Sequence, residues 1–208
     1  MKTRLLHDDS ASSAAEFALL LPLLMTLLFG IIDAGRFAWE YNRAEKATQV
    51  GIRIAVVTDS VPTGLQSENY VGTTVGGVTL TQGDVIPAAA LGEITCTEAS
   101  GCTCTTTPCP ATIGTIDYTN TGVFKSLLLP SMQSMKSDIT SANVELHFYG
   151  SGLGYAGDPN GMDIAPIVGV RLTGVQFVPI TSYLFTSFTM PAILSTLSAE
   201  DLSGTTSN

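Results

Sequence analysis

An uncharged apolar run near the N-terminus constrains the fold more than any other feature of this chain. Residues 17–32 read FALLLPLLMTLLFGII and contain no charged side chain. A membrane-spanning helix needs ~20 apolar residues, so this run fits either a short span or the core of a signal peptide. A long leader of mixed charge precedes the run, Glu16 adjoins it, and no small-residue cleavage site follows it. These features favour a retained anchor helix over a cleaved signal.

The helical pattern continues beyond the apolar run. Apolar residues recur at steps of three and four, the spacing of one helix face, at Phe37, Tyr41, Ala44, Ala47, Val50, Ile54 and Val57. We therefore expect one helix over about residues 14–57, roughly 65 Å long at 1.5 Å per residue. Its first half suits an apolar environment such as lipid, and its second half is amphipathic. Phe37, Tyr41 and Ile54 are expected to be buried against a sheet.

The negative charge lies in the C-terminal part of the chain. The formal net charge is -9, and the residues after Arg53 include three basic and twelve acidic side chains. A domain of this charge repels phosphate backbones, which argues against nucleic-acid binding. The length of 208 residues is enough for one domain with its own core in addition to an anchor.

Four cysteines lie close together in a stretch rich in Thr and Pro. They are Cys96, Cys102, Cys104 and Cys109. Zinc sites usually use C-x2-C pairs or Cys and His pairs, and this spacing fits neither. On the exported side of a membrane, an even cluster of cysteines indicates two disulfides, with a metal site or free thiols as the alternatives. Three pairings are possible, and the sequence does not choose among them. Residues 95–115 are expected to form a stapled surface loop without regular structure.

The rest of the chain has the patterns of a mixed α and β domain. Short strands and turns are expected over residues 58–92, and a short helix within 124–140 whose Met132, Met135 and Ile139 face the core. Residues 144–148 alternate between apolar and polar, as do residues 167–177, which predicts two strands that pair as a hairpin. His147 shares the polar face of its strand with Glu145 and is expected to face solvent.

Two further segments allow more than one interpretation. The turn that contains Asp158, Asn160 and Asp163 could supply oxygen ligands to calcium, but it lacks the remaining ligands of an EF-hand, so a plain hairpin loop is the preferred interpretation. The second apolar run, residues 177–197, is long enough to span a membrane. Two prolines and many Ser and Thr residues argue against a span, and predict a strand end followed by a helix or loop packed on the domain.

No catalytic motif occurs in the sequence. G-x-S-x-G, H-E-x-x-H and a phosphate-binding glycine loop followed by Lys are all missing, and only two histidines are present. The chain is therefore predicted not to be an enzyme and to need no cofactor or metal. A secreted enzyme of unrecognised type remains as an alternative class.

The N-terminal segment resembles the TadE/TadG-like family, pseudopilins of the tight-adherence (Flp) pilus system. The resemblance rests on Ala14-Ala15, then Glu16-Phe17, Pro22 within a Leu run, Phe29-Gly30, Asp33, Gly35-Arg36 and the Gly51-Ile52-Arg53 pattern. It covers about a fifth of the chain. The strand, proline and apolar tail of the C-terminal part also resemble the end of such proteins, and the lack of a long inserted domain favours the shorter, pseudopilin-like branch.

This resemblance implies a processing and assembly pathway. A prepilin peptidase would cut the leader so that Glu16 becomes the fifth residue, which places the cut between Ala11 and Ser12. The family usually has Gly before the cut, and this chain has Ala11. Glu16 would then pair with the new amino group of a neighbouring subunit. The alternative for Glu16 is an interfacial charge favoured by the helix dipole. Residues Glu16, Pro22, Gly30, Asp33 and Arg36 would belong to the assembly helix.

The sequence and the resemblance together predict an α+β protein with a long N-terminal helix packed on a small antiparallel sheet. Its expected parts are a cytoplasmic leader (1–11), a transmembrane and amphipathic helix (12–57), an extracytoplasmic domain (58–200) and a disordered tail (201–208). The expected location is the bacterial inner membrane, with the domain in the periplasm or, after assembly, outside the cell. The implied partners are other pilin or pseudopilin subunits, the prepilin peptidase and the inner-membrane assembly machinery. A permanently anchored, unprocessed scaffold or binding protein is the alternative function, and adhesion, priming and tip-capping all stay open.

Overall fold

The computed structural model describes residues 9–110, 113, 122–182, 186–199 and 202. The chain divides into two compact units, and each is described here by itself. The first, called the helix unit, contains residues 1–41 and 176–189. The second, called the sheet unit, contains residues 42–175 and 190–208. The expected leader lies mostly outside the described residues, as does the expected tail apart from Leu202.

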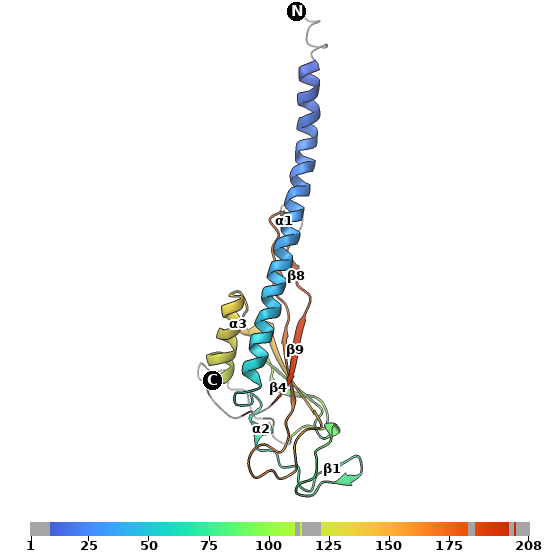
Figure 1. Cartoon of the computed structure of the whole chain (residues 1–208), viewed down its shortest axis with the longest axis vertical. Helices are drawn as coiled ribbons and strands as arrows, with labels where there is room; N and C mark the ends of the chain where they lie inside the picture. Colours follow the sequence, from blue (N-terminus) through green and yellow to red (C-terminus); the bar gives the residue numbers. More distant parts are fainter. Residues whose placement is uncertain (1–8, 111–112, 114–121, 183–185, 200–201, 203–208) are drawn as a thin grey trace, which may run out of the picture. The chain divides into compact units, whose positions relative to one another are not determined.

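Helix α1 is one continuous element over Asp9–Ala55 (Figure 1). Its 47 residues correspond to roughly 70 Å at 1.5 Å per residue. The predicted helix over 14–57 is therefore confirmed. Pro22 lies inside α1, where its missing N–H removes one backbone hydrogen bond. The Thr26 hydroxyl donates to the Pro22 carbonyl at 2.8 Å.

The helix unit pairs the first part of α1 with a short hairpin. Strand β7 (Gln176–Phe177) is antiparallel to β8 (Phe188–Thr189), and Phe177 lies opposite Phe188. The sequence predicted one strand over 167–177 and then a helix or loop. Instead, the strand that begins at Ile167 ends at Leu172, and the second apolar run contributes to β7, β8 and β9.

The sheet unit is built on a five-stranded antiparallel sheet in the order β4-β3-β5-β6-β9. Its strands are β3 (Glu93–Thr97), β4 (Gly101–Thr106), β5 (Val144–Tyr149), β6 (Ile167–Leu172) and β9 (Ile193–Ser198). The predicted hairpin of β5 and β6 is confirmed, with Val144 opposite Leu172. The β3–β4 hairpin replaces the irregular loop that the Thr and Pro content predicted for the cysteine stretch.

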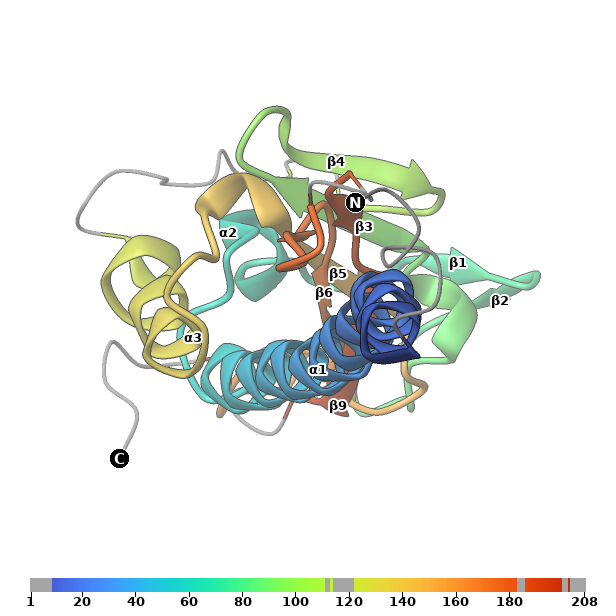
Figure 2. The ribbon, with the colours of Figure 1, turned by 90° about the horizontal axis from the view of Figure 1, so that it is seen from above.

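One face of this sheet is covered by the C-terminal part of α1 and by α3 (Leu129–Met135) (Figure 2). The helices approach closely at Gly51, where an added Cβ would lie 2.9 Å from Met132 Sδ. Arg43 Nε donates to the Met135 carbonyl at 2.8 Å, which ties α3 to α1. A π-helical turn, Phe124–Leu128, precedes α3. The core between these layers includes Ala44, Ala47, Ile94, Phe124, Leu128, Met132, Leu146, Phe148, Val168 and Val170.

The remaining elements of the sheet unit are short. They are α2 (Thr63–Gln66), β1 (Thr74–Val75), β2 (Val78–Thr79) and two 3-10 turns, Ala88–Ala90 and Ser141–Asn143. Strands β1 and β2 are joined by Gly76 and Gly77, both with positive φ. A two-residue hairpin turn with positive φ at both positions favours glycine there. The short strands predicted for residues 58–92 are thus present.

Two expectations about buried side chains need correction. Ile54 is buried in the sheet unit as predicted. Phe37 and Tyr41 are only half-buried, and Phe37 packs on Phe177 and Phe188 of the small hairpin rather than on a strand of the main sheet. The helical spacing identified the apolar face correctly, but it could not show that two different sheets would cover it.

Candidate functional site

The first half of α1 exposes its apolar side chains. Within the described residues of the helix unit, the large side chains of the run 17–32 are all exposed or nearly so, including Phe17, Leu20, Leu23, Leu24, Leu27, Leu28 and Ile31. A continuous apolar surface of this kind indicates a partner or a membrane rather than water. Over the described part of the chain, α1 is the one helix long and apolar enough to cross a membrane.

Glu16 stands at the start of this surface. Its side chain is exposed, and no hydrogen bond or ion pair to another described residue involves it. Phe17 beside it is 61% exposed. The bond between Ala11 and Ser12 lies inside α1, which begins at Asp9. A peptidase that cuts this bond has to open the first turn of the helix, where the N–H groups have no intrahelical partner but the carbonyl groups are already acceptors.

Asp33 binds the hairpin of the helix unit to α1. The carboxylate accepts the Ile180 N–H at 2.7 Å, the Thr181 N–H at 2.9 Å and the Thr181 hydroxyl at 2.7 Å. Arg36 Nη1 donates to the same carboxylate at 3.1 Å. Asp33 is only 7% exposed, and a buried carboxylate needs such donors to offset its lost hydration. We call this set of contacts the Asp33 clasp.

An aromatic cluster lies next to the clasp. Phe37 of α1, Phe177 of β7 and Phe188 of β8 have ring centroids 5.4 to 5.5 Å apart, and the Phe37 and Phe177 rings meet edge to face. The Arg36 guanidinium lies 5.5 Å from the Phe177 centroid. Edge-to-face and cation-π contacts of this kind fix the orientation of the rings as well as burying area. The hairpin is therefore attached to α1 by both polar and aromatic contacts.

A mostly apolar hollow of about 290 Å³ adjoins these contacts in the helix unit. Gly30 and Ala34 line it from α1, and Pro179 lines it from the hairpin. An added Cβ at Gly30 would meet no atom within 4 Å. Of the predicted assembly residues, the structure thus brings Gly30, Asp33 and Arg36 together around the hairpin. Glu16 and Pro22 lie in the exposed part of α1 and contribute nothing to this hollow.

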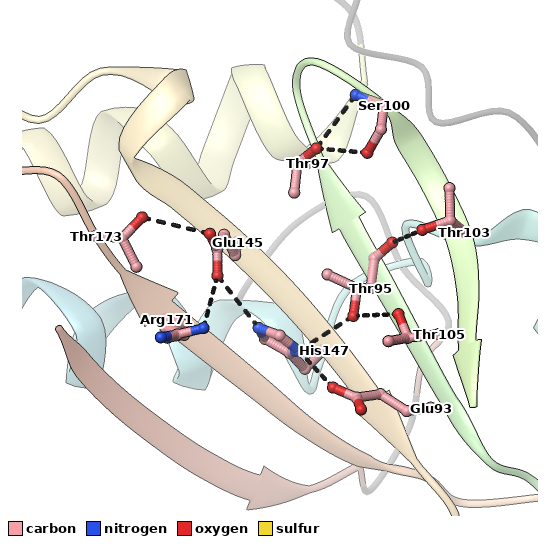
Figure 3. Close-up of polar contacts among 10 residues, drawn as sticks. All are labelled: Glu93, Thr95, Thr97, Ser100, Thr103, Thr105, Glu145, His147, Arg171 and Thr173. Carbon is pink, nitrogen blue, oxygen red and sulfur yellow. Dashed lines mark hydrogen bonds and ion pairs between the residues drawn. The ribbon is translucent and has the colours of Figure 1, made fainter.

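A second cluster lies on the outer face of the main sheet (Figure 3). His147 Nδ1 is 2.9 Å from Glu93 Oε1, and His147 Nε2 is 3.6 Å from Glu145 Oε2. Arg171 Nη1 also contacts Glu145, at 3.3 Å. The prediction that His147 faces solvent is wrong, since the residue is 7% exposed. The two carboxylates and the stacked ring of Tyr149 surround the imidazole, and Glu93 comes from a strand that the sequence had not predicted.

Tyr149 lies on the same face of the sheet, and its pKa differs from the ordinary value for tyrosine. Burial, with the Glu93 carboxylate adding to it, raises the pKa of Tyr149. The ionisable groups of the cluster contact one another, but His147 Nε2 is a buried side-chain atom that has no hydrogen bond among the described residues. The composition of the cluster, one imidazole between two carboxylates with an arginine beside them, is that of a polar layer on the face of a sheet.

The alternative calcium ligands, Asp158, Asn160 and Asp163, are joined by hydrogen bonds within their loop. Asp163 accepts the N–H groups of Tyr70, Gly157 and Asp158 at 2.8 to 3.1 Å, and Asp158 accepts the Asn160 N–H at 2.9 Å. Both oxygens of Asp163 and Oδ1 of Asp158 thus accept backbone N–H groups. Across the described residues, no group of three acidic, His or Cys side chains could hold a metal. Burial, together with Glu68 and Asp163, raises the pKa of Tyr70 to about 12.

Both disulfides lie in and beside the β3–β4 hairpin. Cys96 pairs with Cys102 directly across the two strands, and Cys104 pairs with Cys109 beyond the end of β4. The first bond therefore closes a short loop within the hairpin, and the second joins β4 to the segment that follows it.

The sequence did not predict the hydrogen-bond partners of the two buried residues Asp33 and His147. Little about Ile180 and Thr181 marks them as partners of Asp33, because besides the Thr181 hydroxyl they contribute backbone N–H groups, which every residue except proline has. The available signal was Asp33 itself, a carboxylate directly after an apolar run, which requires compensation wherever it is buried.

One family model matches the chain. It is the model of TadE-like proteins, and it matches residues 11–53, which include the exposed apolar half of α1, Asp33 and the start of its buried half. No curated protein and no solved structure matches the chain.

Proposed function

From the TadE-like segment at residues 11–53, we propose that this protein is a pilin-like minor subunit, a pseudopilin, of a Tad/Flp-type pilus. It is anchored in the bacterial inner membrane by α1, with the disulfide-bonded domain on the extracytoplasmic side. It takes part in pilus assembly or adhesion through contacts with other pilin subunits and with the assembly machinery. Its role is structural and involves no catalysis.

The exposed apolar surface of α1 is the observation that carries this proposal. Soluble proteins rarely expose a continuous apolar surface as large as this run of leucines and isoleucines, so another molecule is expected to cover it. Before assembly this surface is covered by lipid, and in a filament it is covered by the equivalent helices of neighbouring subunits. Both disulfides agree with an oxidising compartment for the sheet unit.

Glu16 has a specific role in this proposal. After cleavage between Ala11 and Ser12, a neighbouring subunit presents a new amino group, and Glu16 pairs with it. A carboxylate at the edge of an apolar helix is costly unless it is paired, which gives the pairing a driving force within the assembly. The Glu16 side chain is exposed and has no hydrogen bond or ion pair with another described residue, which supports this role.

Glu16→Ala is the test of assembly. The variant is expected to stay in the membrane and to be lost from isolated pili, as measured by quantitative immunoblotting of both fractions. Glu45→Ala is the matched control, because Glu45 is another exposed glutamate of α1, outside the apolar run. Incorporation of Glu16→Ala at the level of the control would refute the proposed pairing.

An unprocessed anchored scaffold is the second candidate function. It is favoured by Ala11 in place of the usual glycine and by the position of the bond to Ser12 inside α1. Intact-mass analysis of the protein from cells that express a prepilin peptidase separates the two candidates. A chain that begins at Ser12 supports the pseudopilin, and a membrane-bound chain that begins at Met1 supports the scaffold.

A further inference from the structure

The hairpin of the helix unit exposes a second apolar surface, next to the point where the apolar run of α1 ends. Residues 177–182 alternate in burial, with Phe177, Pro179 and Thr181 buried and Val178, Ile180 and Ser182 exposed. Val178 is 57% exposed and Ile180 is 48% exposed. The inward residues pack on α1, so this segment displays two branched apolar side chains outward. We call residues 178–180 the VPI loop.

The Asp33 clasp fixes the position of this loop along α1. Ile180 donates its N–H to Asp33 at 2.7 Å, and Arg36 Nη1 lies 3.5 Å from the Val178 carbonyl. Asp33 follows directly after Ile32, the last residue of the apolar run. The VPI loop therefore lies within about one helical turn, roughly 5 Å, of the point where α1 leaves its apolar stretch.

Residues around the loop have the character of a membrane boundary. Ile31 and Ile32 of α1 are exposed on the apolar side, and Trp39 is 67% exposed roughly 9 Å further along the axis than Asp33. Tryptophan is enriched at the level of lipid headgroups, and Arg side chains extend toward them. The half-exposed Arg36 suits an anionic headgroup.

The chemistry of the hairpin segment also fits lipid. No charged residue lies between Arg171 and Glu200, so the loop brings no charge that would have to be desolvated. Irregular backbone is not tolerated in the hydrocarbon region, where its polar groups would find no partner. The loop backbone must therefore stay at headgroup level, and only the side chains of Val178 and Ile180 can reach the acyl chains.

We propose that the VPI loop is a second membrane contact, which inserts Val178 and Ile180 shallowly into the bilayer that α1 spans. The apolar run of α1 ends at Ile32, and the clasp holds the loop beside the next residue, Asp33. This inference rests on the proposed membrane anchoring. It assigns the hairpin a function of its own, to fix the depth and tilt of α1 at the bilayer surface.

Fluorescence of the full-length protein in vesicles tests this contact. The chain has one tryptophan, so Trp39→Phe removes the background, and Ile180→Trp then reports from the loop. The vesicles contain phosphatidylethanolamine and phosphatidylglycerol, with a quencher placed on the acyl chain either near the headgroup or near its methyl end. Val178→Trp is a second reporter in case the first variant folds poorly. Val78→Trp is the matched control, an exposed valine on the β1–β2 hairpin of the sheet unit.

The expected result is quenching of the loop tryptophan by the shallow lipid quencher, weaker quenching by the deep one, and little quenching by aqueous acrylamide. The Val78→Trp control should show the reverse, with strong acrylamide quenching. Strong acrylamide quenching at the loop, in protein that resists alkaline extraction from the vesicles, would overturn the lipid contact and leave anchoring intact. Protection from acrylamide and both lipid quenchers would mean that protein covers the loop, which also overturns it. Release of the protein at alkaline pH would overturn anchoring and the loop contact together.

Discussion

Helix α1 carries two apolar surfaces that differ in what covers them. Over residues 17–32 the large side chains are exposed, whereas over residues 44–55 the small and branched side chains Ala44, Ala47, Ile52 and Ile54 are buried in the sheet unit. The first surface is made of long leucine side chains, which suit a fluid apolar environment. The second combines isoleucine with small residues such as Ala44, Ala47 and Gly51, which allow a close approach to other elements. The two surfaces therefore differ in the small residues at the points where the second one packs against its neighbours, such as Gly51 beside Met132.

The largest expected effect comes from a charge placed in the buried surface. Ala47→Asp should destabilise the sheet unit by about 3–5 kcal/mol, because the carboxylate would be buried without a partner. Ala38→Asp is the matched control, since Ala38 is an exposed alanine of the same helix and its replacement should stay within about 0.5 kcal/mol. Urea unfolding in detergent, followed by near-ultraviolet circular dichroism, measures both. Equal losses in the two variants would contradict the assignment of the buried face.

A charge in the exposed apolar run is expected to weaken membrane insertion and to leave the stability of the sheet unit unchanged. Leu24→Asp places a carboxylate at the centre of the apolar run. This substitution should make membrane insertion less favourable by about 3 kcal/mol. The same substitution should leave urea unfolding of the sheet unit in detergent unchanged, because Leu24 is exposed in the helix unit. The measurement is the fraction of protein that integrates into the membrane, reported by a fused insertion reporter. Ala38→Asp is again the control. Normal insertion of Leu24→Asp would mean that the run does not lie in lipid.

The disulfides should matter for the sheet unit alone. Each closes a short loop, with sequence separations of 6 and 5, and the chain-entropy model gives about 2 kcal/mol for loops of this size. The double variant Cys96→Ser/Cys102→Ser should lose more than Cys104→Ser/Cys109→Ser, since Cys96 is buried and a serine hydroxyl there would need a hydrogen bond. Urea unfolding compares the two. A larger loss for the second pair would contradict the core position of Cys96.

The smallest and most local effect is expected at the clasp. Asp33→Asn removes the charge and part of the acceptor capacity, so the amides of Ile180 and Thr181 should lose protection from hydrogen exchange. Amides of β5 in the sheet unit should exchange as before. Asp158→Asn, in an exposed loop of the sheet unit, is the control. Unchanged protection at Ile180 and Thr181 would show that the aromatic cluster alone holds the hairpin.

Much of this architecture could be predicted from local patterns. The three-four spacing from Phe37 onward predicted a continuous helix, and the alternation at residues 144–148 and 167–177 predicted two paired strands, the second of which ends at Leu172. These elements are encoded by side-chain periodicity within a short window. The same alternation placed Glu145 and His147 on one face of β5 correctly.

The failures have a common physical cause, which is pairing between distant segments. The cysteine stretch forms strands because β3 pairs with β5, fifty residues away, and that pairing overrides its Thr and Pro content. His147 is buried because the same pairing brings Glu93 beside it. Similarly, β7 pairs with β8, and the segment after β7 is held to α1 by Asp33, mainly through the backbone N–H groups of Ile180 and Thr181, which the sequence does not distinguish from others.

Lipid cross-linking of the unmodified, full-length protein tests the contrast between the two surfaces of α1 most directly. The protein is placed in vesicles that contain a lipid with a photoreactive acyl chain, and the cross-linked residues are mapped by mass spectrometry. We predict cross-links over residues 17–32 and none over residues 44–55. Cross-links missing from residues 17–32, or equally frequent over residues 44–55, would contradict the account.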